Sequence, residues 1–207
     1  MAHRHLVLAI CVLFGLTTGQ TALSQTSSVV GIGIAGSDDH VYYFYTGGRV
    51  SSGTTSDPQR YRRTYNANYP PAKPVRAVAI AGSNDHVYYF YQDGTVSAGT
   101  TNNARQYRDY YSANLPTNKS LLAVAIAGSN DHVYYWWSDG TVSSGTTSNP
   151  VRYRNYYPSN QPGNKQLIGV GIAGSNDHVY YCYSDGTVSA GTTDNPTRYR
   201  VYYNSGL

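Results

Sequence analysis

A segment of 46 residues occurs four times in this chain without an insertion, and the last copy lacks only its linker. Three sets of residues keep this spacing from copy to copy: Ile34, Ile80, Ile126 and Ile172; His40, His86, His132 and His178; Gly53, Gly99, Gly145 and Gly191. The copies cover residues 29–74, 75–120, 121–166 and 167–207. A repeat of this length indicates similar units that stack on one another and bury a shared core.

Each copy has the pattern of a small antiparallel sheet. In the second copy, residues 75–80 are mostly apolar, and residues 86–91 are aromatic and β-branched, so both segments predict strands. Asp93-Gly94 is a strong signal for a hairpin turn. It leads into a third predicted strand over residues 95–100.

The end of each copy contains two signals. Tyr107 to Tyr111 alternate in a way that predicts a fourth, outer strand. Just before it, three copies place Asp or Asn in front of Pro, which is typical of a helix start. We therefore expect one helical turn before the outer strand. The dipeptides are Asp57-Pro58, Asn149-Pro150 and Asn195-Pro196.

Four strands in about 46 residues match one blade of a β-propeller. The chain has no Glu and only three Lys, so common helix-forming residues are scarce, and this favours an all-β fold. Small residues such as Ala77 and Ala79 suit a crowded innermost strand. The predicted fold is a four-bladed β-propeller. The alternatives are an eight-bladed ring made by two chains and another internally symmetric β fold.

The first residues have the pattern of a secretory signal peptide. Arg4 precedes an apolar run over residues 6–16, and Ala22 and Ser24 fit a cleavage site before residue 25. We expect a signal peptide over 1–24 and one mature repeat domain over 25–207, secreted to the extracellular space or periplasm. A retained anchor is the alternative. Cleavage would leave Cys182 as the only cysteine, so no intramolecular disulfide is expected.

An Asp-His pair follows the first predicted strand of every copy. The Asp and His side chains are candidates for binding a ligand hydroxyl or a metal, although adjacent residues of a strand point to opposite faces and chelate poorly. The alternative is a turn in which Asp accepts backbone N–H groups. We expect no metal and no cofactor. The pairs are Asp39 and His40, Asp85 and His86, Asp131 and His132, and Asp177 and His178.

A second candidate set lies around the predicted hairpin. Aromatic rings bind the apolar faces of sugars, and Tyr and Trp add a hydrogen-bonding group. Packing between blades is the alternative role. The aromatic candidates are Tyr45, Tyr91, Trp137 and Tyr183, and the acidic ones are Asp93, Asp139 and Asp185. The first copy has Gly47 at the Asp position and Arg49 where the others have Thr, so its hairpin would be a defective site.

Alternating Arg and Tyr residues near the end of each copy allow several interpretations. Such alternation can bind single-stranded nucleic acid, but a net charge of only +4 in an exported protein argues against it. Protection of an edge strand, stacking of Arg on Tyr, and binding of an anionic polysaccharide remain open. No nucleophile, phosphate-loop or zinc-protease motif occurs, and a fourfold repeated site is unusual for catalysis. We therefore expect no enzymatic activity.

The chain combines a signal pattern, repeats of the length of a propeller blade and polar turns rich in Tyr and Trp. With these features, residues 29–207 resemble the tandem-repeat propeller lectins of the tachylectin and tectonin kind. The resemblance concerns architecture and composition. It implies one shallow sugar site per repeat and high avidity from several sites. We therefore expect a multivalent carbohydrate-binding protein, monomeric or homodimeric, with glycans or polysaccharides as partners and no membrane span. A structural or protein-binding propeller of the envelope or extracellular matrix is the alternative.

Overall fold

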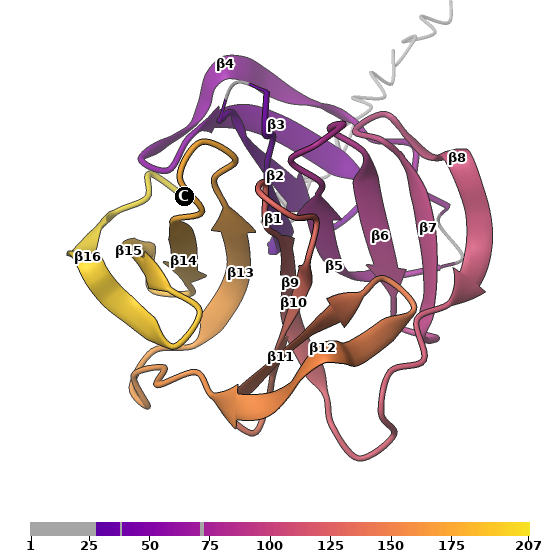
Figure 1. Ribbon diagram of the computed structural model, residues 1–207. Coiled ribbons are helices and arrows are strands. Elements are labelled where there is room, and N and C mark those ends of the chain that lie inside the picture. Colours follow the sequence, from indigo (N-terminus) through magenta and orange to yellow (C-terminus); the bar gives the residue numbers. More distant parts are fainter. Residues whose placement is uncertain (1–27, 38, 71–72) are drawn as a thin grey trace, which may run out of the picture.

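A computed structural model describes residues 28–37, 39–70 and 73–207. It is an all-β four-bladed propeller in which four antiparallel four-stranded sheets surround one axis (Figure 1). Each blade lies within one sequence copy, and its strands are hydrogen-bonded in the order in which they occur along the chain. The predicted signal peptide, residues 1–24, lies outside the described residues.

The strands have nearly the same length in every blade, with a ten-residue outermost strand. Blade 1 contains β1 (Val29–Ile34), β2 (Val41–Tyr45), β3 (Arg49–Thr54) and β4 (Asp57–Asn66). Blade 2 contains β5 (Val75–Ile80), β6 (Val87–Tyr91), β7 (Thr95–Thr100) and β8 (Asn103–Ser112). Blade 3 contains β9 (Leu121–Ile126), β10 (Val133–Trp137), β11 (Thr141–Thr146) and β12 (Asn149–Pro158). Blade 4 contains β13 (Leu167–Ile172), β14 (Val179–Tyr183), β15 (Thr187–Thr192) and β16 (Asn195–Asn204).

The predicted inner strands are confirmed almost residue for residue. β5 and β7 have the predicted bounds, and β6 begins one residue later than predicted because His86 belongs to the preceding turn. The predicted hairpin between β6 and β7 is also present. Gly94 adopts φ +79°, a conformation that L side chains rarely tolerate, and its N–H donates to the carbonyl of Tyr91 at 3.1 Å.

The predicted helical turn before the outer strand is wrong. β3 and β4 are instead joined by two residues, and Pro58 is already the second residue of β4. Proline is tolerated there because β4 pairs only with β3, so its missing N–H is not needed by another strand. The turn brings β4 so close to β3 that a Cβ on Gly53 would overlap the carbonyl oxygen of Asp57.

Aromatic rings of neighbouring blades pack against one another in the core. Phe44 and Tyr89 meet edge to face at 5.8 Å between ring centroids, and Phe90 with Tyr135 and Trp136 with Tyr181 repeat this contact. The fourth counterpart, Cys182, is buried and free, and burial raises the pKa of its thiol to about 12. Cys182 therefore takes the place of an aromatic ring in the core without forming a disulfide.

The axis is closed by small residues. A Cβ on Gly31 of β1 would stand 2.8 Å from the backbone nitrogen of Val78, so only glycine fits beside β5. At one end of the axis, four glycines, one from each blade, contact each other. A Cβ added to any of them would overlap the backbone of the glycine in the next blade. The four glycines are Gly36, Gly82, Gly128 and Gly174. The predicted crowding of the innermost strands is confirmed.

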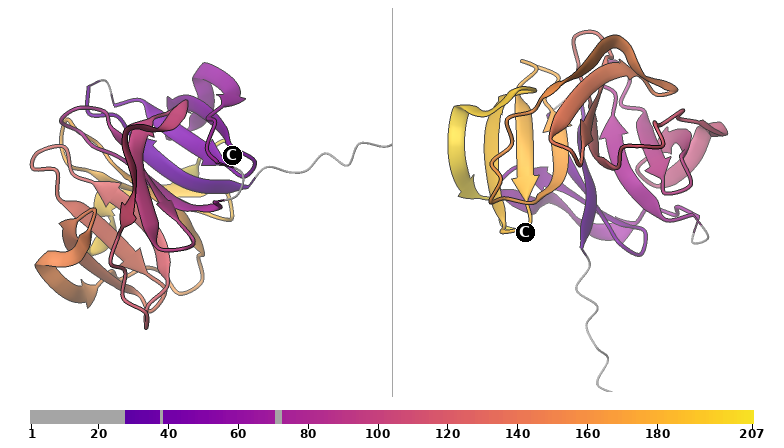
Figure 2. Two further views of the ribbon diagram at one scale, coloured as in Figure 1. Left: turned by 90° about the vertical axis from the view of Figure 1, so that its right-hand side faces the viewer. Right: turned by 90° about the horizontal axis from the view of Figure 1, so that it is seen from below.

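One chain closes the ring, so the eight-bladed alternative is wrong. β1 packs against both β5 and β13. Ser175 of blade 4 donates its hydroxyl to the carboxylate of Asp39 in blade 1 at 2.5 Å, and the Tyr203 hydroxyl donates to Thr55 at 2.8 Å. The C-terminal end lies beside the first blade (Figure 2).

No helix that could span a membrane was found among the residues that the structure describes.

Candidate functional site

The predicted site residues lie at two opposite ends of the ring. His86 precedes β6 and Asp93 follows it, so five strand residues, roughly 3.3 Å each, separate the two ends. We call the end with residues 35–40 and their counterparts the turn face. The end with residues 46–48 and their counterparts is the hairpin face. The Asp-His pairs therefore do not share a site with the aromatic and acidic candidates of the hairpin.

On the turn face, three Asp residues of the Asp-His pairs accept hydrogen bonds from a neighbouring blade: Asp39, Asp85 and Asp177. Asp85 adopts φ +56°, a conformation that Asp tolerates better than most residues, and does not belong to a strand. Its carboxylate accepts the Gly36 N–H at 3.0 Å and the Ser37 hydroxyl at 2.6 Å from the preceding blade. The hydrogen bond within the turn, which was predicted for Asp, is made by the neighbouring Asn84. Its side-chain oxygen accepts the His86 N–H at 2.9 Å.

Each histidine of the turn face stacks on an exposed tyrosine of the outermost strand. His86 and Tyr107 lie 4.0 Å apart between ring centroids with 20° between their planes. The same stack recurs as His40 with Tyr61, His132 with Tyr153 and His178 with Tyr199. The four tyrosines are about half exposed, at 49–50%. The fold thus presents one pre-oriented aromatic surface per blade.

A polar groove lies beside this stack between neighbouring blades. Between blades 2 and 3, a small cavity of about 170 Å³ is lined by Asn84 and Tyr88 on one side and by Asp131 and Thr147 on the other. We call these four residues and their counterparts the junction groove. Arg108, which follows the stacked Tyr107, lies close enough to Tyr88 of the groove to lower its pKa.

The electrostatic environment of this groove recurs around the ring. Desolvation raises the pKa of Tyr88, the Asp131 carboxylate raises it further, and the Arg108 guanidinium lowers it. Tyr134 has the same influences from Asp177 and Arg154, and Tyr180 has them from Asp39 and Arg200. A groove with ring, carboxylate, amide and hydroxyl groups has the chemistry needed to hold a sugar ring and its hydroxyls.

The aromatic candidates of the hairpin face are mostly buried. Tyr91 and Trp137 are 1% exposed and Tyr183 is fully buried, whereas Tyr45 is partly exposed. The Trp137 indole donates to Ser143 at 3.0 Å, and its ring stacks on Tyr135. These rings fill the space between blades, so three of the four offer no open face for a sugar.

The acidic candidates of the hairpin are held in ion pairs. Lys73 pairs with Asp93, Lys119 with Asp139, and Lys165 with Asp185. Each Asp also accepts the hydroxyl and N–H of the following Thr, as Asp93 does from Thr95 at 2.6 and 3.1 Å. Hydrogen bonding to Lys73 and Thr95 lowers the pKa of Asp93 to about 2. The first copy lacks both partners of this pair, with Gly47 and Ser27 at these positions.

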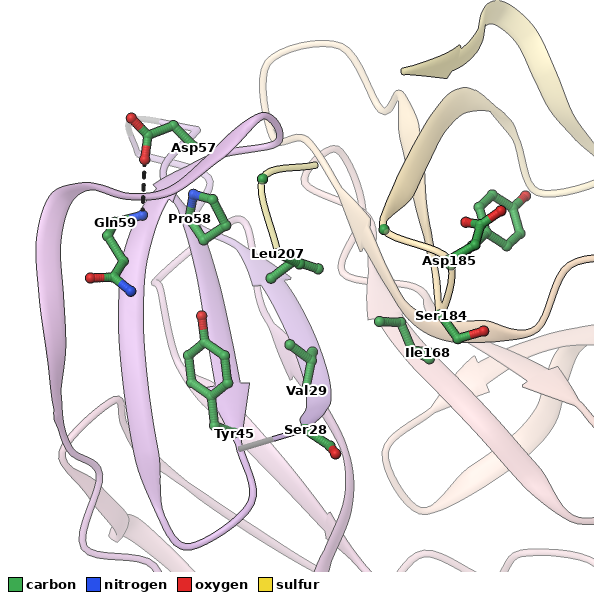
Figure 3. A pocket seen from close by; sticks show the side chains of 13 residues that line it. Ser28, Val29, Tyr45, Asp57, Pro58, Gln59, Ile168, Ser184, Asp185 and Leu207 are labelled. Carbon is green, nitrogen blue, oxygen red and sulfur yellow. Dashed lines mark hydrogen bonds between the residues drawn. The ribbon is translucent and has the colours of Figure 1, made fainter. Parts of the chain in front are cut away.

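A larger cavity of about 780 Å³ lies on the hairpin face between blades 4 and 1 (Figure 3). Tyr45, Asp57 and Gln59 line it from blade 1, and Asp185 and Leu207 from blade 4. A related cavity of about 720 Å³ lies between blades 1 and 2. These cavities differ in size and lining from junction to junction, whereas the Asp-His pair and the stacked Tyr of the turn face recur in every blade. The first copy differs at one groove position, with Asp38 as the counterpart of Asn84, and Asp38 lies outside the described residues.

No group of three or more His, Cys, Asp or Glu that could hold a metal ion occurs within residues 28–37, 39–70 and 73–207. Neither a scan against protein-family models nor a search of curated proteins gave a match to this chain. The function must therefore be argued from the geometry of the molecule itself.

Two sets of turn-face residues were missing from the predicted site. They are Tyr61, Tyr107, Tyr153 and Tyr199, and Tyr42, Tyr88, Tyr134 and Tyr180. Both positions are Tyr in all four copies, and this identity could have marked them as candidate site residues. The sequence does not show that the first set, 21 residues beyond each histidine, stacks on it.

Proposed function

We propose that this protein is a secreted, multivalent carbohydrate-binding protein whose sites are the four junction grooves of the turn face. The observation that carries the proposal is the half-exposed tyrosine stacked on a histidine at the same place in every blade. An exposed ring held rigidly by a second ring loses little freedom on binding and can pack against the apolar face of a sugar.

The neighbouring polar groups supply hydrogen bonds for the hydroxyls of the sugar. In the groove between blades 2 and 3 these are the amide of Asn84, the carboxylate of Asp131 and the hydroxyl of Thr147. The 170 Å³ cavity is smaller than the roughly 300–1,000 Å³ of pockets that bury a drug-sized ligand. Each groove would therefore take one sugar residue at a shallow depth.

Fourfold repetition suits binding better than catalysis. Linking several weak sites on one rigid body can raise avidity by roughly 10²–10⁴ without any new contact. A glycosidase needs two carboxyl groups in different environments, whereas here the same Asp-His pair and stacked Tyr recur in each blade. We therefore propose a non-catalytic binding protein, with export directed by the predicted signal peptide.

The test is a glycan array probed with the chain from residue 25, which contains every described residue. We expect selective binding that survives a chelator, because the grooves need no metal. Loss of binding on chelation would contradict the metal-free site. Absence of binding to every glycan, by protein shown to be folded, would refute the proposal and favour a structural or protein-binding propeller.

A pair of matched variants then locates the site. Tyr153→Ala with Tyr199→Ala removes two stacked rings that are 50% exposed. Tyr156→Ala with Tyr202→Ala removes rings of the same strands that are 40% and 39% exposed and lie under Lys119 and Lys165. Only the first pair should weaken glycan binding. Equal weakening by both pairs would exclude the turn face as the site.

A further inference from the structure

The arginines of this protein are concentrated on the outermost strands. The chain has 12 arginines, and nine of them lie on β4, β8, β12 and β16. All nine are exposed: Arg60, Arg62, Arg63, Arg105, Arg108, Arg152, Arg154, Arg198 and Arg200. The same four strands contain only two acidic residues, Asp57 and Asp109. We call these nine arginines the arginine rim.

Most of the arginine rim has no carboxylate partner. Within the described part of the chain, Arg105 forms an ion pair with Asp109 at 3.4 Å, and no other member of the rim lies in an ion pair. The carboxylates Asp93, Asp139 and Asp185 are instead paired with the three lysines on the hairpin face. The outer surface is therefore a belt of positive charge.

Arginine rather than lysine at these positions is informative. Protection of an edge strand from unwanted pairing needs only a charge, and Lys is the residue most used for it. All three lysines of the chain lie elsewhere. Arg has a planar fork of donors that matches the two oxygens of a carboxylate or sulfate, and it stacks on aromatic rings.

One arginine per blade is held at the edge of the junction groove. The Arg108 guanidinium lies 3.7 Å from the centroid of the Tyr111 ring, and the Tyr111 hydroxyl donates to Thr147 of the next blade at 2.8 Å. Arg62, Arg154 and Arg200 stack in the same way at 3.6–3.8 Å. Stacking leaves the N–H edges of a guanidinium free for an anion. Tyr107, which stacks on His86, directly precedes Arg108.

We propose that the ligand of this protein is an anionic polysaccharide, with sulfate or uronic acid groups bound by the arginine rim and sugar rings packed on the stacked tyrosines. This inference rests on the proposed function and specifies its ligand class. Arg108 stacks on Tyr111, whose hydroxyl bonds to Thr147 of the groove, so a charge lies beside the groove, as a sugar with an acidic substituent requires. Multiple grooves around one belt suit a long chain better than a single oligosaccharide.

Blade 2 provides a natural guide for the variants. It has Gln106 where the other blades have Arg60, Arg152 and Arg198, and its fold is the same. The triple variant Arg60→Gln, Arg152→Gln and Arg198→Gln therefore introduces a side chain already tolerated at that position. The matched control is Arg49→Thr, which removes an exposed arginine outside the rim and introduces the Thr of the other three copies.

The experiment measures binding of the wild-type chain and both variants to dextran sulfate, to polygalacturonate and to neutral dextran, over a series of salt concentrations. For the wild type we expect binding to at least one anionic polymer, weakened by salt, and little binding to neutral dextran. The triple variant should bind the anionic polymer about tenfold more weakly. A plot of the logarithm of affinity against the logarithm of salt concentration should also be less steep for this variant. Its slope should fall by about one unit per lost contact. The control should match the wild type.

The alternative results distinguish this inference from the proposed function. Equal binding to neutral and anionic polymers would overturn the ligand class and leave the carbohydrate-binding function standing. Binding to single-stranded DNA as strong as to the anionic polysaccharide would show a general polyanion surface and overturn the inference. A second rim variant removes the stacked arginines through Arg62→Gln, Arg108→Gln, Arg154→Gln and Arg200→Gln. Unchanged affinity of both rim variants, with wild-type thermal stability, would exclude the arginine rim as the site. No binding to any polysaccharide, together with a negative glycan array, would refute both proposals.

Discussion

Replacing Gly128 by alanine should destabilise the propeller, because the four axial glycines leave no room for a methyl group. A Cβ at this position would lie 2.5 Å from Cα and 2.9 Å from the carbonyl oxygen of Gly174, whereas ordinary contact begins at 3.4 Å. The shortfall to Cα is about 0.9 Å, and both neighbours are backbone atoms that cannot rotate away. Blades 3 and 4 would have to separate at the axis.

The expected loss of stability follows from two opposing effects. Overpacking costs roughly 1–3 kcal/mol, and a rigid backbone neighbour favours the upper part of this range. Alanine also restricts the unfolded chain, which offsets about 0.4–1 kcal/mol. The net change in the free energy of unfolding is a loss of about 2 kcal/mol. For a domain of this size, that lowers the melting temperature by about 4–8 °C.

The assay is thermal unfolding of the wild type and two glycine variants, followed by circular dichroism. Gly163→Ala is the control, because a Cβ there has no neighbour within 4 Å and its φ is not positive. This variant should melt at or slightly above the wild-type temperature. If Gly128→Ala melts as high as Gly163→Ala, the axis is not closed by glycine contacts and the reasoning is refuted.

Three further predictions concern titratable groups. Burial raises the pKa of Tyr91 and of Tyr183 to about 12, so absorbance titration should show these two ionising at higher pH in the folded than in the unfolded chain. Their stabilising contribution, fully present below about 10, should be lost as pH rises through 12. Hydrogen bonding to Lys73 lowers the pKa of Asp93 to about 2, so its small stabilising contribution, present above about 3.9, should be lost as pH falls through 2. Lys73→Gln should move the NMR-measured pKa of Asp93 upward, and an unchanged value would contradict the ion pair. The buried Cys182 thiol should react with a thiol reagent only when the protein is unfolded, and fast reaction in the native state would contradict its burial.

The repeat and the alternation within strands were enough to predict the blades. Periodicity of two assigns residues to the two faces of a strand, and Asp-Gly marks a hairpin, so β5 to β7 could be placed from local pattern alone. The outer strand was predicted with a false helical turn because Asp57-Pro58 has the pattern of a helix start. At the edge of a sheet the same dipeptide can begin a strand, since no further strand needs the N–H of the proline.

The candidate site could be predicted only in part, because its contacts join distant parts of the chain. Asp39 was selected from its position beside His40, but its partner Ser175 is 136 residues away. The burial of Trp137 likewise depends on packing between blades, which the alternation within β10 does not show. The stacked Tyr107 was missed because an isolated strand does not indicate which neighbouring ring it meets.

The sequence by itself determined that four similar units form antiparallel sheets, since that information lies in the repeat and in local patterns of side chains. Only the tertiary structure decided that one chain closes the ring, and that the Asp-His pairs and the hairpin aspartates lie at opposite ends of it. The physical reason is that distances between blades depend on how the units pack around the axis. The glycines at that axis contact one another only when the ring is closed.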